Sequence, residues 1–256
     1  MKYSPLLSKL VAAVFTLPLL SAIAAATAAT PVKNIVIVHG AFADGSGWQA
    51  VAAILTRDGY TVSVVQEPLT SLAEDAAATK RVLDLQTGPS LLVGHSYGGA
   101  VVTEAGNAPN VAGLVYVAAF IPDQGESVVG LLGKAPAANN DMRATKDDFL
   151  YLDPEAYPLD FAADLPPSQA NFMARSQPML AKAAGGAPLT TAAWRTKRSW
   201  ALVAINDHNI NPDLERTMAK HAGCEITEIP GSHAVYASHP TEVADLIERA
   251  AKTLSQ

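Results

Sequence analysis

The sequence predicts an α/β fold in which a mostly parallel six-stranded sheet is flanked by helices, with a mainly helical cap inserted after the fourth strand. Two observations lead to this prediction. Short apolar runs alternate with stretches that suit helices, which is the pattern of a parallel sheet covered on both faces. The alternation stops at residue 122 and resumes at residue 194, so the interval between them is expected to be an insertion.

The chain before the insertion supplies four of the strands. Asn34–Val38 is a β-branched run typical of a buried strand. Gly59 is placed to end a helix, and Ser71 with Glu74 three residues later forms a capping box that begins another. The elements expected here are strands over 34–38, 61–65, 90–93 and 111–119, and helices over 46–57, 71–85 and 99–106.

The interval 122–193 contains many prolines and short helix-compatible pieces but no clear strand. It is too long for a plain loop in a compact domain, so we interpret it as a cap on the core. Several of its apolar side chains could form a lid over the sheet edge, although each of them could equally pack the cap onto the core. These side chains are Phe149, Leu150, Tyr151, Leu152, Tyr157, Phe161, Phe172 and Met173.

After the insertion the alternation continues to the end of the chain. Pro212 occupies a first helical position, which suits a proline because its missing N–H is not needed there. The expected elements are strands over 199–205 and 225–229, and helices over 212–221 and 240–254. The core is therefore expected to consist of residues 29–121 and 194–256.

The N-terminus resembles a secretory signal peptide. Lys2 and Lys9 precede an apolar run over 10–20, and small residues follow over 21–30. We expect cleavage between Ala24 and Thr30, with residues 1–28 as the approximate leader, and a mature protein exported to the periplasm or the medium. An uncleaved membrane anchor is the alternative, and the short apolar run and Pro18 weigh against it.

Composition excludes some partners. The formal net charge is −6 and the basic residues form no cluster, so a nucleic-acid partner is not expected. The single cysteine, Cys224, excludes an intramolecular disulfide and a zinc site of the cysteine-cluster type.

The stretch Gly94-His95-Ser96-Tyr97-Gly98 carries the clearest chemical signal. A strand that turns at once into a helix on two glycines forces the middle residue onto a tight corner, where its side chain stands above the sheet edge. Ser96 is therefore the candidate nucleophile. Such a short pattern can also be a glycine-rich turn with a chance serine, so the prediction needs partners for Ser96 elsewhere in the chain.

A serine hydroxyl needs a base, and the base needs an anion that orients it. Functional groups of parallel sheets gather past the carboxyl ends of strands. His233 follows the last strand directly and is the candidate base, with His208 as an alternative. Asp207 follows the preceding strand and is the candidate acid. Asp123, after the strand over 111–119, is the other acid considered.

Attack of the Ser96 hydroxyl on a carbonyl carbon would also need two N–H donors for the oxyanion that develops. The backbone N–H of Tyr97, at the mouth of the new helix, is one candidate. The other is the N–H of Ala41, or less favourably that of Phe42, in the turn after the first strand. Phe42 and Phe120 are expected to contact a substrate because they flank these strand ends.

The motifs together resemble the compact branch of the α/β-hydrolase superfamily that includes plant methylesterases, hydroxynitrile lyases and small bacterial esterases. The resemblance runs from about Asn34 to Leu254 and is weak across the cap. It is carried by V-H-G-A-F at 38–42, G-H-S-Y-G-G at 94–99, D-x-x-I-x-P at 207–212 and G-S-H at 231–233. It implies a triad in the order Ser96, Asp207, His233, favours Asp207 over Asp123, and implies no cofactor and no metal.

The resemblance implies an exported serine hydrolase that cleaves small-molecule carboxylic esters. A ligand-binding or sensing homologue with slow turnover is the alternative. Hydroxynitrile lyases of this branch carry threonine where Gly40 stands and lysine where Ala234 stands, so lyase chemistry is not favoured. Perhydrolase-type chemistry uses the same triad and stays open. The acyl and alcohol groups cannot be read from the sequence, and either a monomer or a homodimer is compatible with it.

Overall fold

The computed structural model describes Met1, residues 30–139 and residues 141–255. The predicted signal peptide therefore lies almost entirely outside the described residues. The central sheet has six parallel strands, as the sequence predicts, and their order is β2-β1-β3-β4-β8-β9. Its strands are β1 (Asn34–Val38), β2 (Thr61–Val65), β3 (Ser90–Ser96), β4 (Val111–Ala119), β8 (Arg198–Ala204) and β9 (Glu225–Ile229).

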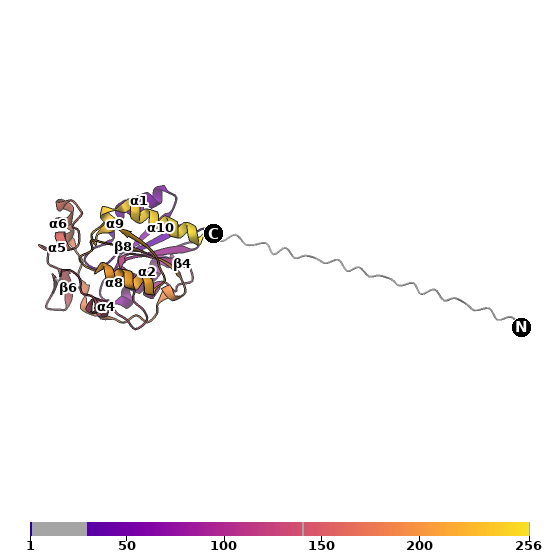
Figure 1. Cartoon of the computed structure of the whole chain (residues 1–256), viewed down its shortest axis with the longest axis horizontal. Coiled ribbons are helices and arrows are strands. Elements are labelled where there is room, and N and C mark those ends of the chain that lie inside the picture. The colour runs from indigo at the N-terminus through magenta and orange to yellow at the C-terminus, as the bar shows by residue number, and fades with distance from the viewer. Residues whose placement is uncertain (2–29, 140, 256) are drawn as a thin grey trace.

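Helices cover both faces of this sheet, which explains why its central strands are apolar on both sides. Every residue of β1 and of β3 is buried. In Figure 1, α1 and α10 lie on one side of the sheet, and α2 and α8 lie on the other. The core helices are the 3-10 helix η1 (Gly45–Trp48), α1 (Gln49–Arg57), α2 (Leu72–Asp84), α3 (Gly98–Ala105), α8 (Pro212–His221), α9 (Val235–Ser238) and α10 (Pro240–Leu254).

The helix ends are built as the sequence indicates. The Ser71 hydroxyl accepts a hydrogen bond from the Glu74 N–H at 3.2 Å, which caps α2. The Asn211 side chain caps α8 by accepting from the Asp213 N–H at 2.9 Å. Gly59 has a φ of +87° just beyond α1. The helix expected over 46–57 is divided, because its first turn is the 3-10 helix η1.

The insertion between β4 and β8 forms the cap, seen at the end of the molecule near α5, α6 and β6 in Figure 1. The prediction of no strand in this interval is wrong, because β5, β6 and β7 form an antiparallel sheet. These strands are only two to four residues long, too short to show an alternating pattern. The cap comprises α4 (Val128–Lys134), β5 (Met142–Ala144), β6 (Phe149–Leu152), α5 (Tyr157–Asp160), α6 (Pro167–Ser176), β7 (Leu180–Ala181), α7 (Lys182–Gly186) and the 3-10 helix η2 (Ala193–Arg195).

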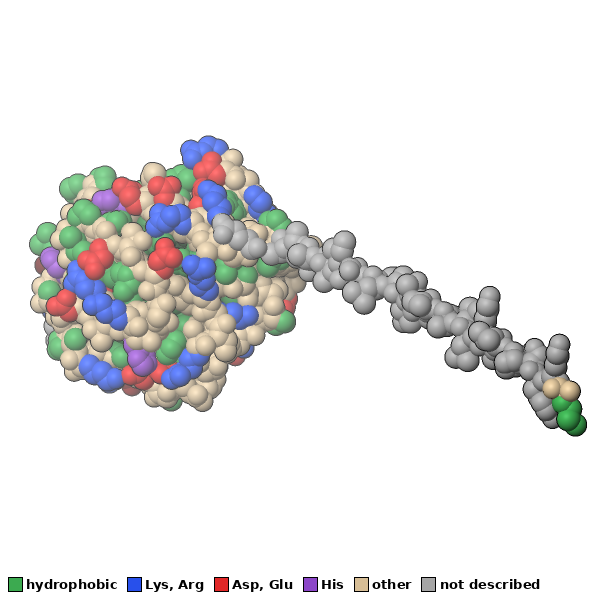
Figure 2. All heavy atoms as spheres, turned by 45° about the vertical axis from the view of Figure 1, so that its right-hand side comes forward, with side chains coloured by type: hydrophobic (Ala, Val, Ile, Leu, Met, Phe, Trp, Pro, Cys, Tyr) green, Lys and Arg blue, Asp and Glu red, His purple; other side chains and the backbone are tan. Residues whose placement is uncertain are grey.

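The surface carries charges of both signs. On the face shown in Figure 2, acidic and basic side chains are interspersed over the domain. No helix in the described part of the chain is long and apolar enough to span a membrane.

Candidate active site

The corner between β3 and α3 holds Ser96 in a strained conformation. Ser96 has a φ of +52°, in the left-handed region that L-residues other than glycine rarely occupy. The glycines on either side are needed for close packing. A Cβ on Gly94 would lie 2.6 Å from the Gly98 carbonyl oxygen, and a Cβ on Gly98 would lie 2.2 Å from the His39 carbonyl oxygen. The corner can therefore form only because both neighbours lack a side chain.

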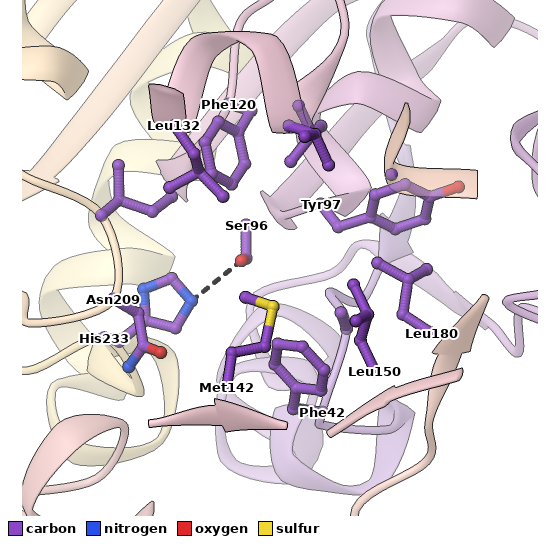
Figure 3. A pocket seen from close by; sticks show the side chains of 15 residues that line it. Phe42, Ser96, Tyr97, Phe120, Leu132, Met142, Leu150, Leu180, Asn209 and His233 are labelled. Atoms are coloured by element: carbon purple, nitrogen blue, oxygen red, sulfur yellow. Dashed lines mark hydrogen bonds between the residues drawn. The ribbon is translucent and has the colours of Figure 1, made fainter. Parts of the chain in front are cut away.

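Ser96 is joined to His233 and Asp207 by two hydrogen bonds. The Ser96 hydroxyl lies 2.9 Å from His233 Nε2, the contact drawn as a dashed line in Figure 3. His233 Nδ1 lies 2.6 Å from Asp207 Oδ2. With the ring proton on Nδ1, His233 donates to Asp207 and accepts from Ser96. The structure thus brings together the three residues that the sequence singles out, and all three are buried.

Asp207 is fixed from its other side by the loop that follows β8. Its Oδ1 accepts hydrogen bonds from the backbone N–H groups of Asn209, at 2.7 Å, and Ile210, at 2.9 Å. These bonds explain the D-x-x-I spacing, because the loop folds back over the carboxylate it carries. The carboxylate therefore keeps one oxygen for His233.

A second carboxyl group lies behind Asp207. Glu215, on α8, is buried, and neither of its carboxyl oxygens meets an N–H or O–H donor among the described residues. Burial raises the pKa of Glu215 well above its usual range, and the adjacent Asp207 carboxylate raises it further. Two carboxyl groups that face each other can make a hydrogen bond only when one carries a proton. Glu215 is accordingly the neutral member of this pair.

His95 lies in the corner between β3 and α3 that carries Ser96, here called the elbow, and holds the His233 loop in place. His95 is completely buried, and burial lowers its pKa well below the usual range. Its neutral ring donates from Nε2 to the backbone carbonyl of His233 at 3.0 Å. His95 is therefore a support for the candidate base and not a second base.

One cap segment contacts both loops of the site. The Tyr157 hydroxyl donates to the Phe42 carbonyl at 2.9 Å. The Phe161 carbonyl accepts from the Ala234 N–H at 2.8 Å, and the Phe161 ring lies edge-on to the His233 ring at 4.7 Å between centroids. Asp164 accepts from the Ser232 N–H at 2.8 Å. The cap thus braces both the turn after β1 and the loop that carries His233.

The turn after β1 packs directly on the elbow. A Cβ on Gly40 would lie 2.7 Å from the Ser96 Cβ, and Phe42 is held at a φ of +63°. Within residues 30–139 and 141–255, the backbone N–H groups of Ala41, Phe42 and Tyr97 donate no hydrogen bond. They are available to a ligand, and the assignment of Ala41 and Tyr97 as the oxyanion donors remains a prediction.

The side chain of Tyr97 runs away from Ser96 into a buried acidic cluster. Its hydroxyl donates to Asp75 Oδ2 at 2.7 Å, and Asp75 Oδ1 accepts from the Leu69 N–H at 2.8 Å. Glu67 lies nearby, and neither of its carboxyl oxygens has a hydrogen-bond partner in the described part of the chain. Burial raises the pKa of Glu67 well above its usual range, and Asp75 adds to the effect. Nothing in the sequence indicated this cluster.

A largely apolar cavity opens above Ser96 and His233, as Figure 3 shows. It holds about 530 Å³ of space that is continuous with solvent. Phe42 and Phe120 line it, and their expected contact with a substrate stays a prediction. The other lining residues are Ala41, Ser96, Tyr97, Val128, Val129, Leu132, Met142, Leu150, Leu180, Gly185, Asn209, Ile210 and His233.

Four of the eight expected lid residues illustrate three different positions. Leu150 lines the cavity, whereas Tyr157 and Phe161 are buried behind it. Phe172 points to solvent, with 70% of its surface exposed. The lining residues that sequence reasoning missed come mainly from α4 and the short cap strands. Asn209 and Ile210 could have been found, because they lie inside the D-x-x-I-x-P motif.

The alternative acid and base have other surroundings. Asp123 accepts from Arg195 Nε at 2.9 Å and lies 3.2 Å from His221 Nε2. Its hydrogen bond with Arg195 lowers the pKa of Asp123 to about 2. His208 makes no side-chain hydrogen bond to Ser96, whose partner is His233. Among the residues described, no group of three histidine, cysteine or acidic side chains could hold a metal ion.

Comparison with curated proteins finds an esterase. The chain is 34% identical over 118 residues to a carbendazim hydrolyzing esterase from Nocardioides sp. (strain SG-4G). The match covers 40% of this chain and 48% of that protein. The chain thus spans about half the length of the curated relative that it matches.

Solved structures show the same fold over nearly their whole length. A crystal structure of a PytH variant is 25% identical with a TM-score of 0.74, covering 86% of this chain and 98% of that one. A pyrethroid hydrolase from Sphingobium faniae JZ-2 is 23% identical with a TM-score of 0.73 and the same coverage. The family model described as the alpha/beta hydrolase family matches residues 35–246. This chain belongs to the α/β-hydrolase family.

Proposed function

We propose that this protein is a serine hydrolase that cleaves carboxylic esters through an acyl-enzyme on Ser96. The observation that carries the proposal is the hydrogen-bonded chain from Ser96 through His233 to Asp207 beneath an apolar cavity. The names of the relatives, a carbendazim hydrolyzing esterase and a pyrethroid hydrolase, support hydrolysis of ester-like substrates.

In the first half of the reaction, Ser96 Oγ attacks the ester carbonyl while His233 Nε2 takes its proton. Asp207 keeps the other ring proton on Nδ1 and stabilises the imidazolium that forms. The N–H groups of Ala41 and Tyr97 bind the oxyanion, and each such donor lowers the barrier by about 3 kcal/mol. His233 then protonates the departing alkoxide, which leaves the acyl group on Ser96.

In the second half, water replaces the alcohol. His233 Nε2 takes a proton from the water, whose oxygen attacks the acyl carbon through the same oxyanion site. The Ser96–acyl bond breaks, Ser96 recovers its proton from His233, and the carboxylic acid is released. Apart from this water, each step uses only the side chains and N–H groups named.

The cavity favours uncharged substrates. No lysine, arginine, aspartate or glutamate is among the residues that line it in the described part of the chain. An ionised group on the substrate would therefore lose its hydration without gaining a counter-charge. We propose neutral esters with apolar or aromatic portions as the substrate class.

The test is a rapid-mixing measurement with p-nitrophenyl butanoate. We expect an initial burst of p-nitrophenol close to one equivalent per protein, or rapid steady turnover, and no burst in Ser96→Ala or His233→Ala. Ser90→Ala is the matched control, because Ser90 is buried in the same strand and its hydroxyl has no partner among the described residues. A full burst in Ser96→Ala would refute the proposal.

We also propose that the chain is exported with its leader removed. The charged start, apolar run and small-residue tail of residues 1–30 support this proposal. Intact-mass measurement of protein recovered from a bacterial host expressing the full chain tests it. We expect a mature start between residues 24 and 31, and retention of Met1 would contradict export by cleavage.

A further inference from the structure

The cavity contains one polar side chain that the proposed reaction does not use. Four of its lining residues have side chains that form strong hydrogen bonds: Ser96, Tyr97, Asn209 and His233. Ser96 and His233 belong to the reaction itself, and the Tyr97 hydroxyl is occupied by Asp75. Asn209 is the remaining one.

The orientation of the Asn209 carboxamide is fixed by its neighbours. Its Nδ2 donates to the Asp160 carbonyl oxygen at 2.6 Å, and a carbonyl can only accept, so the nitrogen must lie on that side. The backbone N–H of Asn209 donates to Asp207, which anchors the residue to the candidate triad. Both anchors hold Asn209 in one position.

The opposite end of the carboxamide is free. Among the described residues, Asn209 Oδ1 accepts no hydrogen bond, and it is not one of the side-chain atoms sealed from solvent. Figure 3 shows this oxygen on the side of Asn209 that faces Met142 and the cavity, beside His233. An acceptor is therefore held, without a protein partner, inside an otherwise apolar space.

The position beside His233 indicates which part of a substrate the acceptor would meet. His233 Nε2 must reach the departing oxygen of the ester, whereas the oxyanion is expected near Ala41 and Tyr97. Residues next to His233 therefore line the alcohol portion. We infer that Asn209 is a specificity-determining residue whose Oδ1 accepts a hydrogen bond from a hydroxyl or N–H group on the leaving alcohol.

This inference rests on the proposed function and narrows its substrate class. The preferred substrates are neutral esters whose alcohol carries a hydrogen-bond donor a few bonds from the ester oxygen. An alcohol that lacks the donor would cover Asn209 Oδ1 and remove it from water without a partner. Sites that hydrogen-bond a substrate group discriminate against the analogue that lacks it.

Two esters of equal size test the inference: 2-hydroxyethyl butanoate and propyl butanoate, which differ only by a terminal hydroxyl in place of a methyl group. The ratio of their kcat/KM values is measured for the wild type and for Asn209→Leu, which keeps the shape but removes the acceptor. We expect the ratio to fall about tenfold in the variant. A ratio is used because general damage to the site affects both esters alike.

Leu180→Met is the matched control, since it alters the cavity wall without changing its polar groups, and its ratio should stay near that of the wild type. Asn209→Ala serves as a second variant should Asn209→Leu fail to fold, with the same expected fall. An unchanged ratio in a folded Asn209 variant that hydrolyses both esters would overturn the inference alone. Failure of the wild type to hydrolyse any ester, including p-nitrophenyl butanoate, would overturn the proposed function and the inference with it.

Discussion

The hydroxyl of Tyr157, in the cap, donates a 2.9 Å hydrogen bond to the backbone carbonyl of Phe42, in the core. Phe42 has a φ of +63° and follows Ala41, the proposed oxyanion donor. A strained backbone of this kind persists only where its surroundings hold it. The cap therefore covers the cavity and also supports the turn on which transition-state stabilisation would depend.

Tyr157→Phe is expected to lower kcat more than it raises KM. The change removes one hydrogen bond, worth about 1 kcal/mol, and loosens the turn that carries Ala41. The resulting fall in kcat should be about fivefold, measured by steady-state hydrolysis of p-nitrophenyl esters. Tyr151→Phe is the control, because Tyr151 lies in the same cap and donates no hydrogen bond among the described residues. Equal kinetics in the two variants would contradict the bracing role.

Glu215 is expected to control the pH profile of the reaction. Burial and the neighbouring Asp207 raise the pKa of Glu215, which favours the protonated carboxyl group, and only in that form can Glu215 donate to Asp207. Glu215→Met removes this donor and leaves more negative charge on Asp207, whose Oδ2 lies 2.6 Å from the ring of the candidate base. The acidic limb of kcat/KM should then move to higher pH.

Glu215→Gln is the matched variant, because its amide keeps an N–H donor of similar size. Its acidic limb should stay within about 0.3 pH unit of the wild type, a difference of less than 0.5 kcal/mol. The acidic limbs are compared by measuring kcat/KM between pH 5 and pH 9 for the wild type, Glu215→Met and Glu215→Gln. Identical shifts in Met and Gln variants would show that the hydrogen bond to Asp207 has no part in the profile.

Glu67 is expected to destabilise the fold as pH rises. Burial raises its folded pKa well above its usual range, so the folded state holds a proton that the unfolded chain releases. Below the pKa of Glu67 in the unfolded chain, near 4.3, the carboxyl group is protonated in both states and costs no stability. As the pH increases from there towards the pKa of Glu67 in the folded protein, the free energy of unfolding decreases. Each pH unit between the folded and unfolded pKa values of Glu67 costs about 1.4 kcal/mol of stability, or about 3–6 °C of Tm in a chain of this size.

The measurement is thermal unfolding of the wild type and Glu67→Gln at pH 5 and pH 8. The Tm of the variant relative to the wild type should increase from pH 5 to pH 8, because glutamine has no proton to lose. Glu155→Gln, at an exposed position, should show no such change between the two pH values. A constant difference for Glu67→Gln would mean that the Glu67 carboxyl does not titrate in this range.

Gly98→Ala is expected to disrupt the elbow. The new Cβ would lie 2.2 Å from the His39 carbonyl oxygen and 2.6 Å from that of Val38, so backbone would have to move. We expect a loss of about 1–3 kcal/mol of stability and at least a hundredfold loss of esterase activity. Gly133→Ala, where the new Cβ meets no atom within 4 Å, should reduce neither the stability nor the esterase activity. Normal activity in Gly98→Ala would contradict the tight packing of the elbow on the first strand.

The sequence was most informative where local patterns meet strict backbone requirements. Ser96 could be found because two glycines and a buried strand force its position, and His233 because it follows the last strand directly. The six core strands are five to nine residues long and each contains apolar residues, which is enough for them to be recognised. Asp207 was selected because it follows the strand before the last one and because the D-x-x-I-x-P resemblance favours it over Asp123. The structure adds that its loop folds back and donates two N–H groups to its Oδ1.

What the sequence did not reveal depends on contacts between distant residues. The strands β5, β6 and β7 are defined by pairing across the cap, since none is long enough to show a period of two. The roles of Tyr157 and Glu215 follow from their neighbours and not from any local motif. Cavity residues such as Met142 and Leu180 are ordinary apolar residues until the cap places them above Ser96.

The proposed function depends most on Ser96 being a nucleophile activated by His233. The most direct test is to treat the folded protein with a serine-directed fluorophosphonate and to map the modified peptide by mass spectrometry. We expect one adduct, on Ser96, formed at least a hundredfold more slowly in His233→Ala and at an unchanged rate in Ser90→Ala. An adduct on another serine, or no adduct on a folded protein whose cavity admits the probe, would contradict it.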